Sequence, residues 1–343
     1  MRIVLIAAVV VPAAMAWRPV RRLNHGPTYD VEELAVAASR AQNASSDGSI
    51  VVLTASRDYT PVLVNWLIFA ERLGVRNWIV VCFDRAIRSF LEKRGVVTCV
   101  GCYMEPARPR ETQKAKRERH RRIWTLRVQM LSDLVSRGIS VTLSDLDAIW
   151  HRDATPKLAA ADVVASRGSF PPWASDLWGA AACMGLVRFN SNQRTRLFVQ
   201  EHLLPTAADL GDDQIALNAA LKNVQIRWKN SNQPAFRNLT YVGSATTDYG
   251  ETATGLTIAL LPHTEFVRRC DLEKIKPDPA SALVVQHCYT PKTVASKRTS
   301  LLSLGSWYLG DHWDIIPPDH NLQPPAMFSA WLNAVARPSP PRR

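Results

Sequence analysis

The chain has 343 residues, of which 47% are hydrophobic and 21% are charged, and its formal net charge is +12. This composition excludes a disordered chain and supplies enough apolar residues for one large domain or two small ones. Half of the excess charge lies between Arg108 and Arg122, where eight Lys or Arg residues face two Glu. No aromatic residue interrupts this segment, so we expect no nucleic-acid partner. We interpret it as a solvated helix start or a surface for an anionic polymer or membrane.

The N-terminus reads as a targeting segment. Arg2 precedes an apolar run that ends in Ala14-Met15-Ala16, which predicts a signal peptide over residues 1–16. The alternative is a short signal anchor that associates the protein with the membrane, although the run is short for a span and contains Pro12. Either reading places the protein in the lumen of the secretory pathway, in the Golgi, or outside the cell after cleavage.

Cysteines and glycosylation sequons agree with that compartment. The six cysteines can form disulfides there, but the sequence does not give their pairing. Cys99 and Cys102 form one C-x-x-C without a second pair or histidines at ligand spacing, which argues against a zinc site. The sequons begin at Asn43 and Asn238 and predict a glycoprotein.

Strand and helix patterns alternate from residue 49 onward. Strands are expected at 49–56, 77–84, 96–100 and 139–147, and helices at 59–74, 85–95 and 112–137. Thr60 is expected to cap its helix, and Gly74, Gly95 and Gly138 to end the three helices. The pattern predicts a mostly parallel, Rossmann-like half-sheet, in which ligands bind outside the carboxyl ends of the strands.

The second half of the chain predicts a mixed arrangement. Strands are expected at 162–166, 183–189, 224–228, 239–242, 256–262 and 282–288, and helices at 192–204 and 211–223. We therefore expect a single α/β domain over 49–316, with a mixed sheet flanked by helices. An N-terminal stem over 17–48 precedes it, and a tail over 317–343 with seven prolines follows it.

Two carboxylates, Asp145 and Asp147, flank one leucine where a strand is expected to end. In a continued strand both side chains would project to one face and repel each other, unless a cation lies between them or one is protonated. Mg²⁺ or Mn²⁺ would resolve the repulsion, and such ions commonly bind carboxylates together with substrate phosphates. The alternative is that one aspartate caps the next turn while the other pairs with Arg152.

The segment VTLSDLDAIWHRDATPKL, residues 141–158, resembles the D-x-D strand end of a known family. This is the nucleotide-diphospho-sugar transferase family that includes plant and algal cell-wall xylosyl-, arabinosyl- and galactosyltransferases. Four further segments resemble the family in the same order, at 51–84, 183–195, 212–218 and 284–309. The likeness covers about residues 50 to 310.

The resemblance implies a glycosyltransferase of the GT-A fold. It implies a nucleotide-diphosphate sugar donor, Mn²⁺ or Mg²⁺, a glycan or glycoprotein acceptor, and transfer with retention. The roles it implies are metal binding by Asp145, Asp147 and His287, donor binding by Asp145 and Lys297, and catalysis by Asp213 and Gln214. Arg127 stands where the family often has lysine. Arginine keeps the positive charge but donates hydrogen bonds from a planar fork, so Arg127 is a candidate for binding the donor.

Two other classes of protein share part of this pattern. A phosphohydrolase of the haloacid dehalogenase type also ends a strand with D-x-D, but it expects Thr or Val where Ile149 stands and Asp where Ala216 stands. A non-catalytic, secreted carbohydrate-binding protein on a transferase fold would be marked by a lost metal ligand, yet both aspartates and His287 are present. Trp173 and Trp178 suit either sugar stacking or a core.

Overall fold

The computed structural model describes residues 29–93, 96, 98–102, 111–229, 245–268, 270 and 283–309. The expected signal peptide, the proline-rich tail, the strand at 239–242, Gly95 and Asn238 lie outside these residues. Among the helices that are described, none is both long and apolar enough to cross a membrane.

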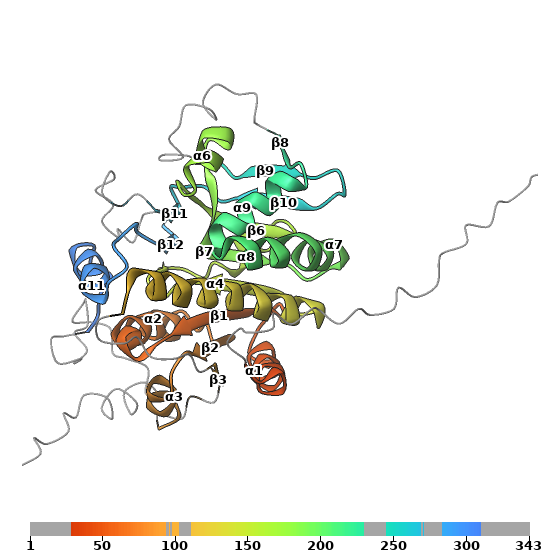
Figure 1. Cartoon of the computed structure of the whole chain (residues 1–343). Coiled ribbons are helices and arrows are strands. Elements are labelled where there is room, and N and C mark those ends of the chain that lie inside the picture. The colour runs from red at the N-terminus through yellow and green to blue at the C-terminus, as the bar shows by residue number, and fades with distance from the viewer. Residues whose placement is uncertain are drawn as a thin grey trace, which may run out of the picture.

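Helices and strands alternate along the chain (Figure 1). The helices are α1 (Val31–Asn43), η1 (Arg57–Tyr59), α2 (Thr60–Arg72), α3 (Arg85–Glu92), α4 (Gln113–Ser136), α5 (Thr155–Leu158), α6 (Pro172–Trp178), α7 (Gln193–Leu197), η2 (Phe198–Leu203), α8 (Leu204–Leu210), α9 (Asp213–Asn223) and α11 (Val294–Ser303). The strands are β1 (Ile50–Ala55), β2 (Trp78–Cys82), β3 (Cys99–Gly101), β4 (Val141–Ser144), β5 (Ile149–Trp150), β6 (Val163–Gly168), β7 (Ala181–Phe189), β8 (Arg227–Trp228), β9 (Asp248–Glu251), β10 (Thr257–Leu260), β11 (Phe266–Val267) and β12 (Val285–Gln286).

Nine strands form one large sheet in the order β3-β2-β1-β4-β7-β6-β10-β9-β8. The first four are parallel, as expected from the strand and helix pattern. Strand β7 is antiparallel to both of its neighbours, β4 and β6, so the sheet as a whole is mixed. The prediction of a mixed α/β sheet flanked by helices is therefore confirmed.

Two predicted details are wrong for local reasons. Thr60 does not cap α2, because the 3₁₀ turn η1 runs directly into the helix and the Thr60 hydroxyl donates back to the Arg57 carbonyl. The helix expected at 192–204 continues to Leu210. Pro205 lies in this continuous helix just after the π-helical stretch η2, and the wider turn accommodates a residue that lacks an N–H group.

Each face of the large sheet carries its own apolar core. One core combines residues of α1, α4, η2, α8 and α9 with one set of strand side chains. The other combines α2, α3 and α11 with the opposite set and with the residues that follow β4. Trp178 is only 6% exposed and belongs to the first core, against which Trp173 packs. Trp178 therefore lies in the core, and Trp173 lies partly buried against it.

A second, small sheet connects distant segments. Its order is β11-β12-β5, with β12 parallel to β11 and antiparallel to β5. Because β5 follows the two aspartates directly, the pairing of Gln286 with Ile149 brings the end of β12 beside the end of β4. This small sheet is what positions the late residues of the site.

The segments around the sheet include two disulfides and the N-terminal helix α1. Disulfides join Cys82 to Cys99 and Cys270 to Cys288, whereas Cys102 is buried without a disulfide. The disulfide of Cys99 leaves no C-x-x-C pair of thiols for zinc. Helix α1, within the range predicted as a stem, buries Leu34 in the core of the domain. Asn43, in the first sequon, is exposed at the end of α1.

We predict that Asn65→Ala lowers the free energy of unfolding by about 3 kcal/mol. Asn65 is fully buried, donates to the Ser306 carbonyl at 3.0 Å and accepts from the Tyr308 N–H at 2.8 Å. The substitution strands both backbone groups away from water. Denaturant titration measures the change, and the exposed Asn223→Ala is the control, expected to stay within about 0.5 kcal/mol. Equal stability of the two variants would contradict the prediction.

Candidate active site

The strand β4 ends at Ser144, and the chain then turns. The Asp145 N–H donates to the Gly185 carbonyl at 2.7 Å, and the Ala148 N–H donates to the Asp145 carbonyl at 3.0 Å. The indole of Trp66 in α2 holds the turn by donating to the Ala148 carbonyl at 3.0 Å. The two carboxylates are thus brought together by a turn and not by the alternation of a continued strand.

His287 faces both carboxylates from the end of β12. Its Nε2 lies 3.5 Å from Asp145 Oδ2 and 3.8 Å from Asp147 Oδ1. Burial and the charge of Arg268 lower the pKa of His287 to about 3, so the ring is neutral at physiological pH. Arg268 follows β11 and donates to His287 Nδ1 at 2.5 Å. Arginine only donates, so the ring proton lies on Nε2 in this arrangement.

Arg127 forms ion pairs with two carboxylates of the site, those of Asp145 and Asp213. It is 7% exposed, and its guanidinium lies 3.2 Å from Asp145 Oδ1 and 3.1 Å from Asp213 Oδ2. Burial alone would raise the pKa of Asp145, but Arg127, followed by His287 and Lys297, lowers it to about 2. Burial raises the pKa of Asp213 to about 6 in spite of Arg127. The two carboxylates that pair with Arg127 therefore have very different pKa values.

Asp213 and Lys297 are each placed by the first turn of a helix. Asp212 caps α9 by accepting from the Ile215 N–H at 2.9 Å, which directs Asp213 into the site. Thr293 caps α11 in the same way, and Lys297 in its first turn donates to Asp147 Oδ2. Burial opposes the charge of Lys297, but Asp147 keeps its pKa above the ordinary value. Lys297 is thus a charged partner of Asp147.

The backbone of Gly185 makes room for these side chains. A Cβ atom at this position would lie 2.0 Å from His287 Cε1 and 2.6 Å from Asp145 Oδ2. Real Cβ atoms do not approach other atoms so closely, so only glycine fits at this point of β7. A glycine inside a strand often marks such a close approach.

The donor set fits a divalent cation. Among the described residues, Asp145, Asp147 and His287 each offer a ligand atom, and these atoms all lie within 4.8 Å of one another. Two carboxylates and one imidazole match hard to borderline ions such as Mn²⁺. Binding at His287 Nε2 would need the tautomer with the proton on Nδ1, so Arg268 would then have to turn away.

Gln214 has a more structural environment than the other predicted residues. Its side chain accepts from the Met184 N–H at 3.3 Å and donates to the Phe170 carbonyl, so both of its ends are occupied by backbone. The structure brings Asp145, Asp147, His287, Lys297, Arg127 and Asp213 into one linked cluster. The sequence did not single out Arg268. It pointed to Gly185 only as the glycine of the segment 183–195 that resembles the family, and the strand-interior position of this glycine is a further signal.

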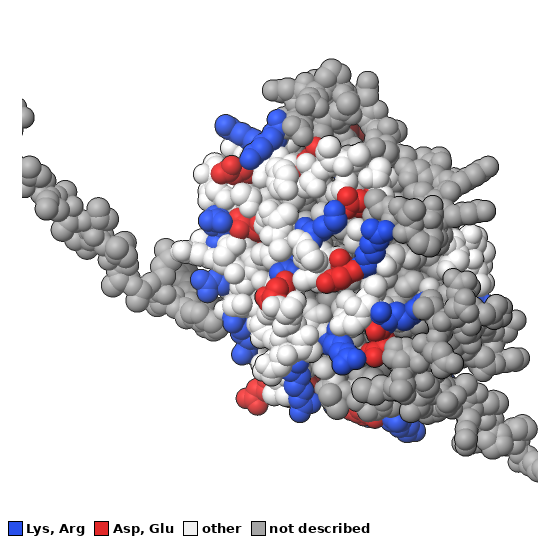
Figure 2. All heavy atoms as spheres, turned by 180° about the vertical axis from the view of Figure 1, so that it is seen from behind, with Lys and Arg blue, Asp and Glu red and all other residues white. Residues whose placement is uncertain are grey.

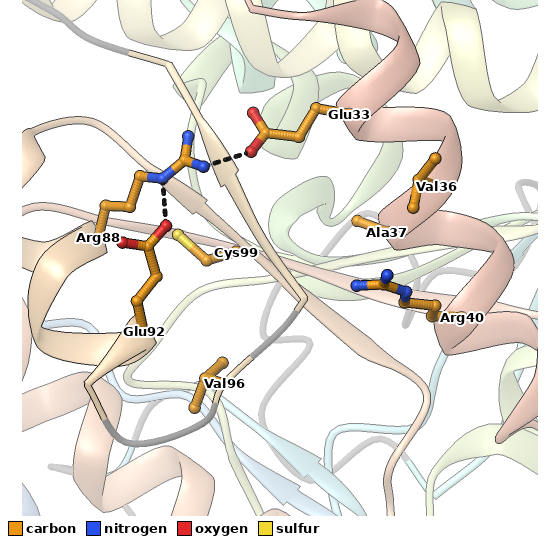
Figure 3. Close-up of a pocket in the computed structure, with 8 residues that line it drawn as sticks. All are labelled: Glu33, Val36, Ala37, Arg40, Arg88, Glu92, Val96 and Cys99. Carbon is orange, nitrogen blue, oxygen red and sulfur yellow. Dashed lines mark hydrogen bonds and ion pairs between the residues drawn. The ribbon is translucent and has the colours of Figure 1, made fainter.

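A cavity of about 480 Å³ lies elsewhere, between α1, α3 and the edge strand β3 (Figure 3). Figure 3 shows Arg88 held between two carboxylates, Glu33 at 2.8 Å and Glu92 at 2.6 Å. These three side chains pair with one another, and β3 is separated from β4 by two strands. This cavity is therefore not part of the site.

The chain matches the family described as nucleotide-diphospho-sugar transferase over residues 73–301. This match covers more than half of the sequence and includes all seven predicted site residues. The chain belongs to the nucleotide-diphospho-sugar transferase family.

Individual relatives are distant. Arabinosyltransferase RRA2 of Arabidopsis thaliana is 24% identical over 145 residues, which cover 39% of this chain and 33% of the relative. The chain thus matches about a third of that relative's length. Among solved structures, the glycosyltransferase GlyE of Streptococcus pneumoniae is 17% identical with a TM-score of 0.35, covering 51% of this chain and 43% of its own. Mouse xyloside xylosyltransferase 1 is 12% identical with a TM-score of 0.33, covering 51% and 82%.

We predict that Gly185→Ala weakens Mn²⁺ binding at least about tenfold while the protein remains folded, because the new methyl group displaces His287 and Asp145. Mn²⁺ binding is measured by electron paramagnetic resonance titration of the free ion. Gly168→Ala is the matched control, since its Cβ would meet nothing closer than 3.5 Å. Unchanged Mn²⁺ affinity in Gly185→Ala would show that these side chains do not hold the ion.

Proposed function

We propose that the protein is a metal-dependent glycosyltransferase that moves a sugar from a nucleotide diphosphate to a glycan or glycoprotein acceptor. The observation that carries the proposal is the convergence of Asp145, Asp147 and His287 at the carboxyl end of β4, with Lys297 beside them. Carboxyl ends of parallel strands are where phosphate-bearing ligands bind in such sheets. Family membership supplies the sugar-nucleotide class.

Departure of the diphosphate is the step that this site assists. A bound Mn²⁺ or Mg²⁺ would supply Lewis-acid stabilisation of the developing negative charge on the diphosphate. Lys297 stays protonated and adds a second positive charge, so the leaving group needs no proton donor. Arg127 fixes the orientation of the Asp145 carboxylate through an ion pair of 3.2 Å.

Asp213 is proposed to face the donor sugar in its ionised form. It stands at the first position of α9, where the helix dipole favours a negative charge, and it pairs with Arg127. A carboxylate here would stabilise positive charge that develops on the sugar ring as the glycosidic phosphate bond breaks. Retention of configuration remains part of this proposal, as does residence in the Golgi or outside the cell.

The test is turnover of a panel of nucleotide sugars with Mn²⁺ in wild type and Asp147→Asn. We expect metal-dependent release of one nucleotide diphosphate, reduced at least about a hundredfold in the variant, because the substitution removes a charged metal ligand. Asp209→Asn, at an exposed aspartate outside the cluster, is the control and should keep full activity. Folded wild type that neither turns over nor binds nucleotide with metal would favour the carbohydrate-binding alternative.

We also predict that the transfer rate rises as the pH increases through about 6, where Asp213 loses its proton. The pKa of Asp145, about 2, and that of His287, about 3, lie too low to change the rate in this range. A profile of kcat against pH from about 5 to about 8 measures the effect. Asp213→Asn should lose the limb near 6 and retain a low, flat rate. A rate that instead falls through about 6 would contradict the ionised role.

A further inference from the structure

We propose that the N-terminal half of α4 binds an anionic glycan acceptor and leads it to the active site. The surface consists of residues 113–122 of α4 together with Lys292, and we call it the basic α4 surface. The inference depends on the proposed transferase function and adds the chemical class of the acceptor: a glycan that carries carboxylate or sulfate groups.

Among the described residues, only part of the charge of this surface is paired: Arg119 pairs with Glu111 and Arg122 with Glu118. Residues 113–122 contain six Lys or Arg and one Glu. Lys114, Lys116 and Arg117 are exposed, and no described residue forms an ion pair with them. On the face seen in Figure 2, by contrast, the blue basic side chains lie interspersed with red acidic ones. A concentration of one sign on a helix favours a partner of the opposite sign.

The basic α4 surface continues into the active site along one stripe of the helix. His120, Trp124 and Arg127 lie at helical spacing, and Arg127 pairs with Asp145 and Asp213. The ring centroids of His120 and Trp124 are 5.4 Å apart. At the rise of an α-helix, His120 lies only about 10 Å along the axis from Arg127. A chain that lies on this stripe would therefore reach the site within a few sugar units.

Lys292 contacts both Trp124 of α4 and Tyr59, which lies near the active-site residues. Its ammonium lies 4.4 Å from the centre of the Trp124 ring, and its carbonyl accepts from the Tyr59 hydroxyl at 3.0 Å. Tyr59 in turn lies within the electrostatic reach of Lys297 and Asp147. Burial, Arg119, Lys292 and Lys116 lower the pKa of His120, which agrees with a positive field over this surface.

An anionic glycan fits better than a membrane or a nucleic acid. Residues 113–122 contain no apolar side chain larger than Ala115, so the helix has nothing to insert into a bilayer. The same stretch offers no series of aromatic rings for stacked bases. Since the active site that it borders belongs to a sugar-transferase family, an acceptor made of sugars is the partner that both features share.

Binding of fluorescent oligosaccharides, compared with that of an anionic polypeptide, tests the inference. The probes are an oligogalacturonate, a sulfated dextran oligomer, a neutral dextran oligomer and polyglutamate. In wild type we expect salt-sensitive binding of one or both anionic glycans and none of the neutral one. The triple variant Lys114→Glu, Lys116→Glu, Arg117→Glu should bind at least about tenfold more weakly. Glutamates are compatible with the first turns of α4, because negative charge there complements the helix dipole.

A second triple variant controls for net charge. Arg196→Glu, Arg227→Glu and Lys229→Glu change the charge equally at exposed positions outside α4 and should leave the affinity within about twofold. Preference for the uronate or for the sulfated probe identifies the acidic group. Equal losses in both triple variants, no glycan binding, or tighter binding of polyglutamate would overturn the inference.

Acceptor-free hydrolysis of the donor separates this inference from the proposed function. The α4 variant should hydrolyse the donor as wild type does, because none of its three residues belongs to the metal and donor cluster. Normal hydrolysis without glycan binding would overturn only the acceptor assignment. Glycan binding by a wild type that shows no metal-dependent nucleotide binding or hydrolysis would overturn the transferase function and, with it, the acceptor role.

Discussion

Repulsion between Asp145 and Asp147 is the constraint around which the rest of the site is arranged. Both carboxylates lie at the end of one strand, and each is compensated by a separate cation, the buried Arg127 for Asp145 and the half-buried Lys297 for Asp147. Without such partners, burying two like charges so close together would protonate one of them. Helices α4 and α11 therefore each supply one of the two cations that stabilise this turn.

The order of the strands explains why residues so far apart in sequence converge. Parallel pairing of β1 with β4 places the D-x-D turn over α2, where Trp66 fixes it. Antiparallel β7 then contributes Gly185, and the small sheet contributes His287. Gly185 permits this convergence, since any larger residue would occupy the space of the His287 ring. The large and small sheets are thus coupled through a few tightly packed atoms.

Much of this arrangement could be predicted from the sequence, and the misses have physical causes. Long apolar runs separated by glycines predicted β1, β2, β4 and their helices, because burial on both faces of a sheet leaves a strong pattern. The two-residue strands β5 and β11 carry no such pattern, so Arg268 and the small sheet were missed. The roles of His287 and Lys297 came from family resemblance, whereas their proximity to Asp147 depends on tertiary pairing that periodicity does not encode.

The charges of the site imply an exchange of partners if the proposed function holds. Lys297 is committed to Asp147, and Arg268 is committed to the ring nitrogen of His287. Neither cation can keep these contacts and also direct the same hydrogen atoms at a donor phosphate. A donor diphosphate bound with a divalent ion would offer Lys297 and Arg268 new anionic partners, and Asp147 and His287 would then hold the ion. Metal and donor would then bind more favourably together than either does alone, because each releases the groups that the other needs.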